Sequence, residues 1–175
     1  MGKLKSRGFT LLEIMVVLVI ISVILTFTTL SLGDGGQLRR IEKTSQRLQA
    51  VIQLAQQEAI IKGSELGLVI TIESYQFVRF TGQVWETLHH DSIFNKHLFP
   101  LDTQLFLTVE GEEMSIFKES KKTTPSTKNA PHLIFFSSGE ITPFTLILHN
   151  DTLAQHGYQL TGDFMGQLNL TSYAR

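Results

Sequence analysis

The chain has 175 residues, a formal net charge of −1 and no cysteine. This length indicates one domain with at most an appendage, and the near-neutral charge excludes a basic surface over the whole chain for nucleic acid. The absence of cysteine excludes disulfides, cysteine-ligated metals and thiol nucleophiles, but it does not indicate a compartment.

A long apolar run follows a short basic N-terminus. Residues 9–32 contain one charged side chain, Glu13. As a helix, the run would be about 36 Å long, which is enough to cross a bilayer. No small-residue cleavage site follows it, so we expect the run to be retained as a membrane helix. Lys3, Lys5 and Arg7 precede it, and by the positive-inside rule they predict a cytoplasmic N-terminus with the rest of the chain outside.

Glu13 needs an explanation, because a charge in a spanning helix costs about 2.5–3.5 kcal/mol. One interpretation places Glu13 near the lipid headgroups, where its carboxylate reaches water. A second interpretation begins with cleavage between Gly8 and Phe9, which would create a new α-amino group. The amino group of a neighbouring subunit could then neutralise Glu13, and the acid would be an assembly residue.

The stretch "RGFTLLEIMVVLVIISVIL" resembles the class III signal of type IV pilin-like proteins. In that family a basic leader ends in glycine, phenylalanine usually follows, and glutamate is the fifth residue of the mature chain. A prepilin peptidase cuts on the cytoplasmic side and methylates the new N-terminus. The resemblance therefore implies a leader at 1–8, cleavage after Gly8, methylation of Phe9, and an assembly role for Glu13 in a transmembrane helix at 9–32.

The segment 33–63 is predicted to continue this helix beyond a soft spot. Gly33, Gly35 and Gly36 each weaken a helix by about 1 kcal/mol relative to alanine. Apolar and small residues then recur at steps of three and four, as on one helix face, and Gly63 is a typical stop. These residues are Leu38, Ile41, Ser45, Leu48, Ile52, Ala55 and Ala59. The soft spot is interpreted either as a hinge used on packing into a filament or as a plain linker.

The segment 64–175 is predicted to be an antiparallel β domain, because short strand-like runs alternate with glycine and proline turns. The predicted strands are Leu66–Ile72, Tyr75–Phe80, Val84–Leu88, Phe106–Val109, His132–Phe136, Phe144–His149, Tyr158–Gly162 and Gln167–Thr171. The lysine-rich stretch 118–131 is predicted to be a solvated loop, or alternatively a contact surface. The fold class is thus α+β and pilin-like, with a long N-terminal helix packed on antiparallel sheets or a β-sandwich.

The stretch "IFFSSGEITPFTLIL" resembles a hairpin signature of the H-type minor pseudopilins of type II secretion. "LAQQEAIIKGSELGLVI" is similar to a second pattern of that family, although Gln56–Gln57 and Lys62 stand where arginines are commoner. Related minor pilins of type IV pili share the hairpin. A well-made hairpin without a binding role is the favoured interpretation of the matching residues, which are Phe135, Gly139, Glu140, Pro143 and Phe144.

The sequence contains no motif of a known catalytic or phosphate-binding site. His89, His90 and Asp91 are a poor metal set, because adjacent histidines on a strand point to opposite faces. Glu110–Glu113 lack the spacing of a calcium loop. We therefore expect no metal, no cofactor and no enzymatic activity.

The resemblance implies a structural minor pseudopilin at the tip of a periplasmic pseudopilus that drives protein export across the outer membrane. Its partners would be the minor pseudopilins of the I, J and K types, the major G-type subunit, the prepilin peptidase and inner-membrane lipid, with no nucleic acid. The expected location is the bacterial inner membrane as a single-pass protein, and the pseudopilus after assembly. The alternatives are a minor pilin of a type IV pilus and, in a third class, a signal-anchored periplasmic enzyme or binding module.

Overall fold

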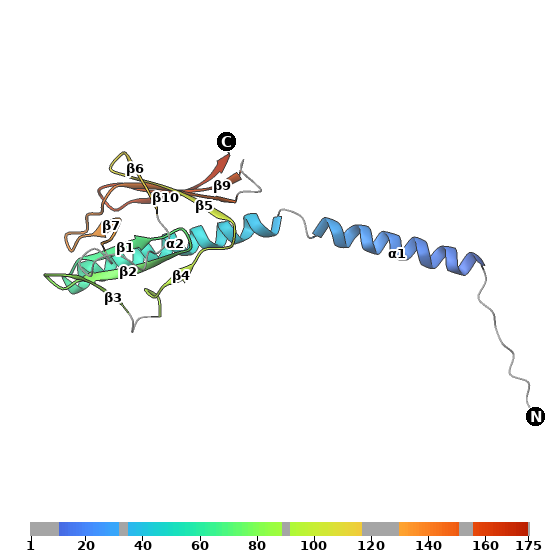
Figure 1. The fold of residues 1–175 in the computed structure, drawn as a ribbon, viewed down its shortest axis with the longest axis horizontal. Helices are drawn as coiled ribbons and strands as arrows, with labels where there is room; N and C mark the ends of the chain where they lie inside the picture. Colours follow the sequence, from blue (N-terminus) through green and yellow to red (C-terminus); the bar gives the residue numbers. More distant parts are fainter. Residues whose placement is uncertain (1–10, 32–34, 89–91, 117–129, 151–155, 175) are drawn as a thin grey trace, which may run out of the picture. The chain divides into compact units, whose positions relative to one another are not determined.

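The structure is a computed structural model that describes residues 11–31, 35–88, 92–116, 130–150 and 156–174, without the side chains of 25–31, 35, 37, 156, 173 and 174. The chain divides into two compact units, 1–36 and 37–175. Figure 1 labels the helices and strands of each unit.

The first unit contains helix α1, Leu11–Ser31, and Glu13 lies in its first turn. That position suits an acid, because the N-terminal end of a helix carries a partial positive charge. Among the described residues, no helix is both long enough and apolar enough to cross a membrane. The predicted membrane segment 9–32 extends beyond the described residues at both ends.

Helix α2, Gly35–Lys62, contributes the central element of the second unit. Leu48, Ile52, Ala55 and Ala59 are each fully buried, and their steps of four, three and four place them on one face. The helix ends where Gly63 adopts a φ of +57° and the Ser64 N–H donates to the Ala59 carbonyl at 3.1 Å. This left-handed cap satisfies a carbonyl that the helix itself cannot.

The strands form two antiparallel sheets. The first sheet has the order β3-β2-β1-β7, with β4 also pairing with β2, and the second has the order β10-β9-β8-β5-β6. The strands of the first sheet are β1 Leu66–Ile70, β2 Ser74–Phe80, β3 Trp85–Thr87, β4 His97–Leu98 and β7 Leu133–Phe135. Those of the second are β5 Thr103–Val109, β6 Glu112–Met114, β8 Phe144–Asn150, β9 His156–Gly162 and β10 Leu168–Ala174.

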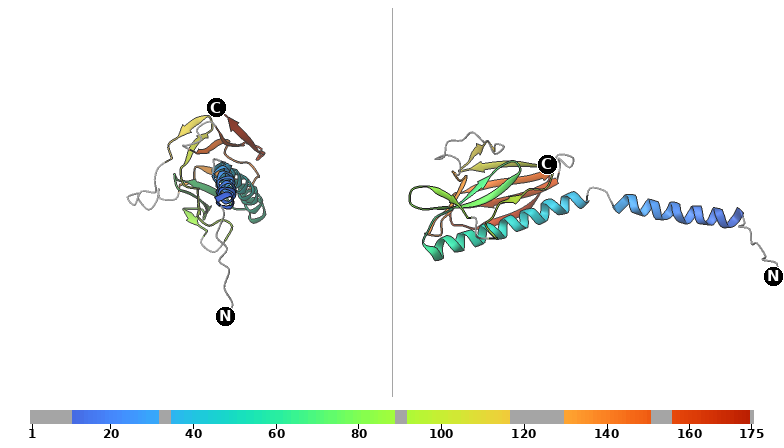
Figure 2. Two further views of the ribbon diagram at one scale, coloured as in Figure 1. Left: turned by 90° about the vertical axis from the view of Figure 1, so that its right-hand side faces the viewer. Right: turned by 60° about the horizontal axis from the view of Figure 1, so that its bottom comes forward.

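One hydrophobic core joins α2 to both sheets. Leu68 and Phe77 come from the first sheet, Leu146 and Leu160 from the second, and Ile52 from α2, and all five are fully buried. Figure 2 shows α2 lying along the strands of this unit. The α+β fold with a helix packed on antiparallel sheets is therefore confirmed.

The structure adds two strands that the sequence did not predict, and two other predictions fall on residues outside the described ranges. The sequence gives no sign of β4 and β6, because strands of two and three residues are too short to show alternation. Helices α1 and α2 lie on either side of the predicted soft spot, and the residues between them, 32–34, lie outside the described residues. The lysine-rich stretch lies outside them as well, apart from Ala130 and Pro131.

Two features of the first sheet can be tested directly. A Cβ added to Gly67 of β1 would lie 2.5 Å from the Pro131 Cβ and 3.1 Å from the Trp85 ring. Beside it, the Ile70 N–H donates to the His132 Nδ1 at 3.1 Å, and burial lowers the pKa of His132 below its usual value of 6.5. The first feature excludes a side chain, and the second requires a neutral imidazole.

Gly67→Ala should destabilise the second unit by about 1–3 kcal/mol, because the rigid Pro131 ring must move. The comparison is Gly36→Ala in α2, where an added Cβ meets no atom within 4 Å and alanine favours the helix. Urea unfolding of the full chain in a mild detergent measures both. Equal midpoints for the two variants would contradict the steric argument.

Stability should fall as the pH drops below about 6.5, because the unfolded His132 then binds a proton that the folded one does not. Above that pH the imidazole is neutral in both states and the contribution is complete. His132→Asn keeps an acceptor for the Ile70 N–H but does not titrate, so part of the pH dependence should disappear. Urea unfolding midpoints at pH 5, 6 and 7.5 measure this pH dependence. An identical change of midpoint with pH in the variant and the wild type would contradict the prediction.

Candidate assembly surfaces

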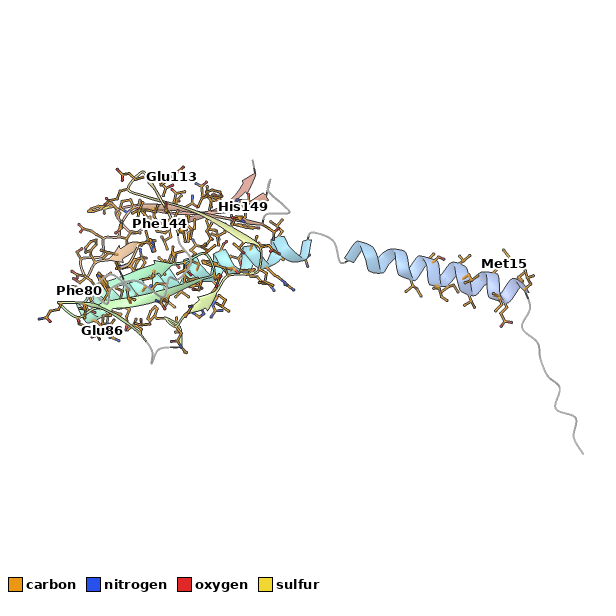
Figure 3. The ribbon with its side chains drawn as sticks, in the orientation of Figure 1. Met15, Phe80, Glu86, Glu113, Phe144 and His149 are labelled. Carbon is orange, nitrogen blue, oxygen red and sulfur yellow. The ribbon has the colours of Figure 1, made fainter. Side chains whose placement is uncertain are left out.

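The apolar side chains of α1 are exposed on every side. Between Leu11 and Ile24 every large hydrophobic side chain is at least 44% exposed, and Met15, labelled in Figure 3, is 60% exposed. A helix that is apolar all round is stable only when lipid or other protein covers it. This surface therefore belongs to an assembly or to a membrane, and Glu13 is its acidic residue.

The residues around the predicted cleavage site are only partly described. Gly8 and Phe9 lie outside the described residues, as does Gly33 of the predicted hinge. Gly35 and Gly36 form the first two residues of α2. The structure thus places Glu13 two residues inside α1 but gives no geometry for the residues that a peptidase would meet.

The hairpin signature forms a tight turn between the two sheets. Gly139 has a φ of +96°, the Phe136 N–H donates to the Glu140 carbonyl at 2.9 Å, and the Thr142 N–H donates to the Ile134 carbonyl at 3.0 Å. Only glycine adopts this backbone conformation without strain. The pairing ends at Pro143, which has no N–H, and the chain then enters β8 of the second sheet.

Pro143 and Phe144 therefore begin a strand in a different sheet from the one that the hairpin leaves. Phe144 is buried between the strands of the second unit (Figure 3), and its ring fills the space beside Gly162 that a Cβ would occupy. Glu140 accepts a hydrogen bond from the Ser138 hydroxyl at 3.1 Å on the exposed turn. The signature residues thus hold a crossing between sheets, which supports a structural role.

The two sites where the sequence departs from the common arginines both make contacts. Lys62 forms an ion pair with Glu58, and Arg79 of β2 lies 3.7 Å from the same carboxylate. Gln56 donates from its amide nitrogen to the Gly166 carbonyl at 3.0 Å. The sequence alone did not reveal these partners, because Arg79 and Gly166 are distant along the chain.

A groove runs beside Gly139, between α2 and the turn that leads from β9 into β10. It has a volume of about 610 Å³, and Ile60 and Met165, which are 52% and 74% exposed, contribute apolar walls. Sequence reasoning did not find this surface. The one feature of the sequence that could have indicated this groove is the recurrence of glutamines along α2.

No metal site appears in the described part of the chain, where no group of three or more histidine, aspartate or glutamate side chains is placed to hold an ion. His89, His90 and Asp91 lie outside the described residues. Glu110 and Glu112 flank the β5–β6 turn on the surface.

These features define a pilin-like protein with a prepilin-type N-terminus. Residues 3–29 match the prokaryotic N-terminal methylation motif, and residues 44–166 match a family described as type II transport protein GspH. The chain belongs to the GspH family, whose members are the minor pseudopilins of type II secretion. It is accordingly a structural protein and not an enzyme.

Similar proteins agree with this assignment. The chain is 35% identical to type II secretion system protein H of Pseudomonas aeruginosa, over 82% of this chain and 83% of the relative. It is 30% identical to the protein of the same name of Aeromonas hydrophila, over 97% and 96%. A crystal structure of the minor pseudopilin EpsH from the type II secretion system of Vibrio cholerae shares the fold, with a TM-score of 0.64 at 23% identity, over 77% of this chain and 97% of that chain.

The family places the protein in the inner membrane and the periplasmic pseudopilus. It also implies processing by a prepilin peptidase and association with pseudopilus components.

Proposed function

We propose that this protein is cleaved after Gly8, methylated on Phe9, and inserted through residues 9–32 into the tip of a pseudopilus that drives protein export across the outer membrane. The observation that carries the proposal is α1, whose apolar side chains are exposed all round and whose acid is the fifth residue after the predicted cut. A filament core made of such helices would cover that surface. The match over residues 44–166 favours secretion over the type IV pilus alternative.

Glu13 in this proposal interacts with the α-amino group of an adjacent subunit. The amino group exists at Phe9 only after cleavage, so assembly depends on processing. Within a water-poor filament core, a carboxylate and an ammonium stabilise each other only together, because either charge alone loses its hydration. The pair therefore selects processed neighbours.

The minor pseudopilins of the I, J and K types and the major G-type subunit are the neighbours proposed here. The topology proposed is a single pass with the leader in the cytoplasm and the second unit in the periplasm. Gly33, Gly35 and Gly36 would let the second unit reorient when α1 leaves the bilayer. The glycines support this because they lower helix stability where the two units meet.

Deleting the gene should stop secretion of the exported enzymes of the host while leaving twitching motility intact. Complementation with the full chain should restore secretion. Lost twitching with normal secretion would instead show a type IV pilus subunit. Activity assays on culture medium and a stab-agar motility test measure the two outputs.

The mature protein should begin at Phe9 and carry one methyl group on its α-nitrogen. Gly8→Ala should block cleavage, because glycine offers no side chain and an unrestricted backbone at the cut, and the chain should remain full-length. Mass spectrometry of the membrane-extracted protein measures both. An N-terminus at Met1 in the wild type, without a methylated Phe9, would contradict the proposed processing.

Glu13→Leu should be inserted and cleaved normally but should enter the pseudopilus at least tenfold less, since breaking a buried charge pair costs about 3–5 kcal/mol. Glu13→Gln is the matched control that keeps the side chain's shape and polarity without its charge. It should fail to a similar extent if the charge is what matters. Quantitative immunoblotting of sheared pseudopili measures incorporation, and wild-type incorporation of Glu13→Leu would end the assembly role.

A further inference from the structure

The outer edge of β10 is the one long edge among the described strands that has no natural protection. Edge strands are normally kept short, charged, bulged or interrupted by proline, so that they do not pair with other chains. β3 and β7 have three residues each, and β6 has three residues of which two are glutamates. In contrast, β10 has seven residues, "LNLTSYA", without charge, proline or bulge, and all seven pair in register with β9.

The hydrogen-bonding groups on this edge can be assigned from the register. The Asp163 N–H donates to the Gln167 carbonyl at 3.1 Å, so Gln167 and every second residue after it bond to β9. The N–H and C=O groups of Leu168, Leu170 and Ser172 therefore point away from β9. In the described part of the chain, no hydrogen bond from another segment reaches these groups.

Helix α2 contacts the β9–β10 hairpin at two points. At one end, Gln56 donates to the Gly166 carbonyl, just before β10 begins. At the other end, the Tyr158 hydroxyl donates a hydrogen bond to the Glu42 carboxylate, and Tyr158 pairs with Ser172 of β10. Burial raises the pKa of Tyr158, and the negative charge of Glu42 raises it further. Glu42 to Gln56 spans about 21 Å of helix and Gly166 to Ser172 about 20 Å of strand, so the helix follows the β9–β10 hairpin, beside the start of β10 at Gly166 and beside β9 at Tyr158.

The helix face beside β10 is a stripe of glutamines. Between Glu42 and Ile60, steps of three and four place Gln46, Gln49, Gln53 and Gln56 on one line, which we call the glutamine stripe. All four side chains are exposed or half-buried. Each amide both donates and accepts hydrogen bonds, as a peptide group does.

The groove between the stripe and the edge is uncharged. Gln53, Gln56, Ile60, Met165 and Leu168 line it, and none of its lining residues carries a charge. A charged segment would lose hydration here without gaining a counter-charge. The groove thus fits an uncharged extended segment that alternates apolar and small polar side chains, as β10 itself does.

We propose that an extended strand of a neighbouring pseudopilus subunit adds to β10 and enters, beside Leu168, the groove lined by Gln53 and Gln56. Its backbone would pair with Leu168, Leu170 and Ser172, and its core-side residues would cover Ile60 and Leu168. This deepens the proposed function and rests on it. A second copy of this chain is the less suitable occupant, because two β10 edges would pair about a twofold axis and close into a dimer, which does not extend a filament.

The decisive experiment follows amide hydrogen exchange of the full chain, alone and in complex with the other minor pseudopilins of its own secretion system, extracted in detergent. The amides of Leu170 and Ser172 should be protected at least about tenfold more in the complex. The amides of Asn169 and Thr171 already bond to β9, so they are an internal control that should change little. Unchanged exchange at Leu170 and Ser172 in an intact complex would overturn the proposal.

A backbone variant tests the same contact in the cell. Ser172→Pro removes an N–H that points away from β9, so β9 loses no hydrogen bond, whereas Ser172→Ala keeps the N–H. Ser172→Pro should have the same melting temperature as Ser172→Ala, but its incorporation into the pseudopilus should be at least tenfold lower. Equal incorporation of the two variants would overturn the proposal.

A second variant covers the case in which Ser172→Pro does not fold. Gln53→Glu places a charge in the groove at an exposed position, and it should lower incorporation tenfold without changing the melting temperature; normal incorporation would count against the groove. Protection of Leu170 that rises with concentration in the isolated chain would show a second copy as the occupant and overturn the choice of partner. Failure of the wild-type chain to restore secretion would count against the proposed function itself.

Discussion

The packing of α2 into both sheets is the interaction on which the rest of the second unit depends. The two sheets share no strand, and they are joined through the core in which α2 buries Leu48, Ile52, Ala55 and Ala59. Two of these four side chains are alanines, which allow the helix axis to approach the strands closely. Once that face is buried, the rotation of the helix is set, and every other face of α2 has a determined neighbour.

That rotation places the functional surfaces. It brings Glu58 between Lys62 and Arg79, and it sets Gln53 and Gln56 beside the start of β10. In α1 the situation is reversed, because the large apolar side chains from Leu11 to Ile24 are exposed. A single protein therefore combines one helix half that completes its own core with another that requires a membrane or other subunits.

How far the sequence predicted these features depended on the range of the interaction. The buried face of α2, the stop at Gly63 and the turn at Gly139 follow from residues within a few positions of one another, and periodicity and backbone preference were sufficient to find them. β4 and β6 were missed because two or three residues carry no period. The partners of Gln56 and Lys62 could not be assigned, since Gly166 and Arg79 come near α2 only in the folded chain.

The sequence by itself determined the prepilin-like N-terminus, the uniformly apolar helix and the positions of eight of the ten strands in the described residues. Each of these features depends only on residues that are close together along the chain, such as a cleavage motif, an apolar run or the alternating side chains of one strand. The tertiary structure alone decided which strands share a sheet, that the chain crosses between sheets at Pro143, and that β10 is an edge lying beside a line of glutamines. The physical reason is that pairing and packing join residues far apart along the chain, where no local preference selects the partner.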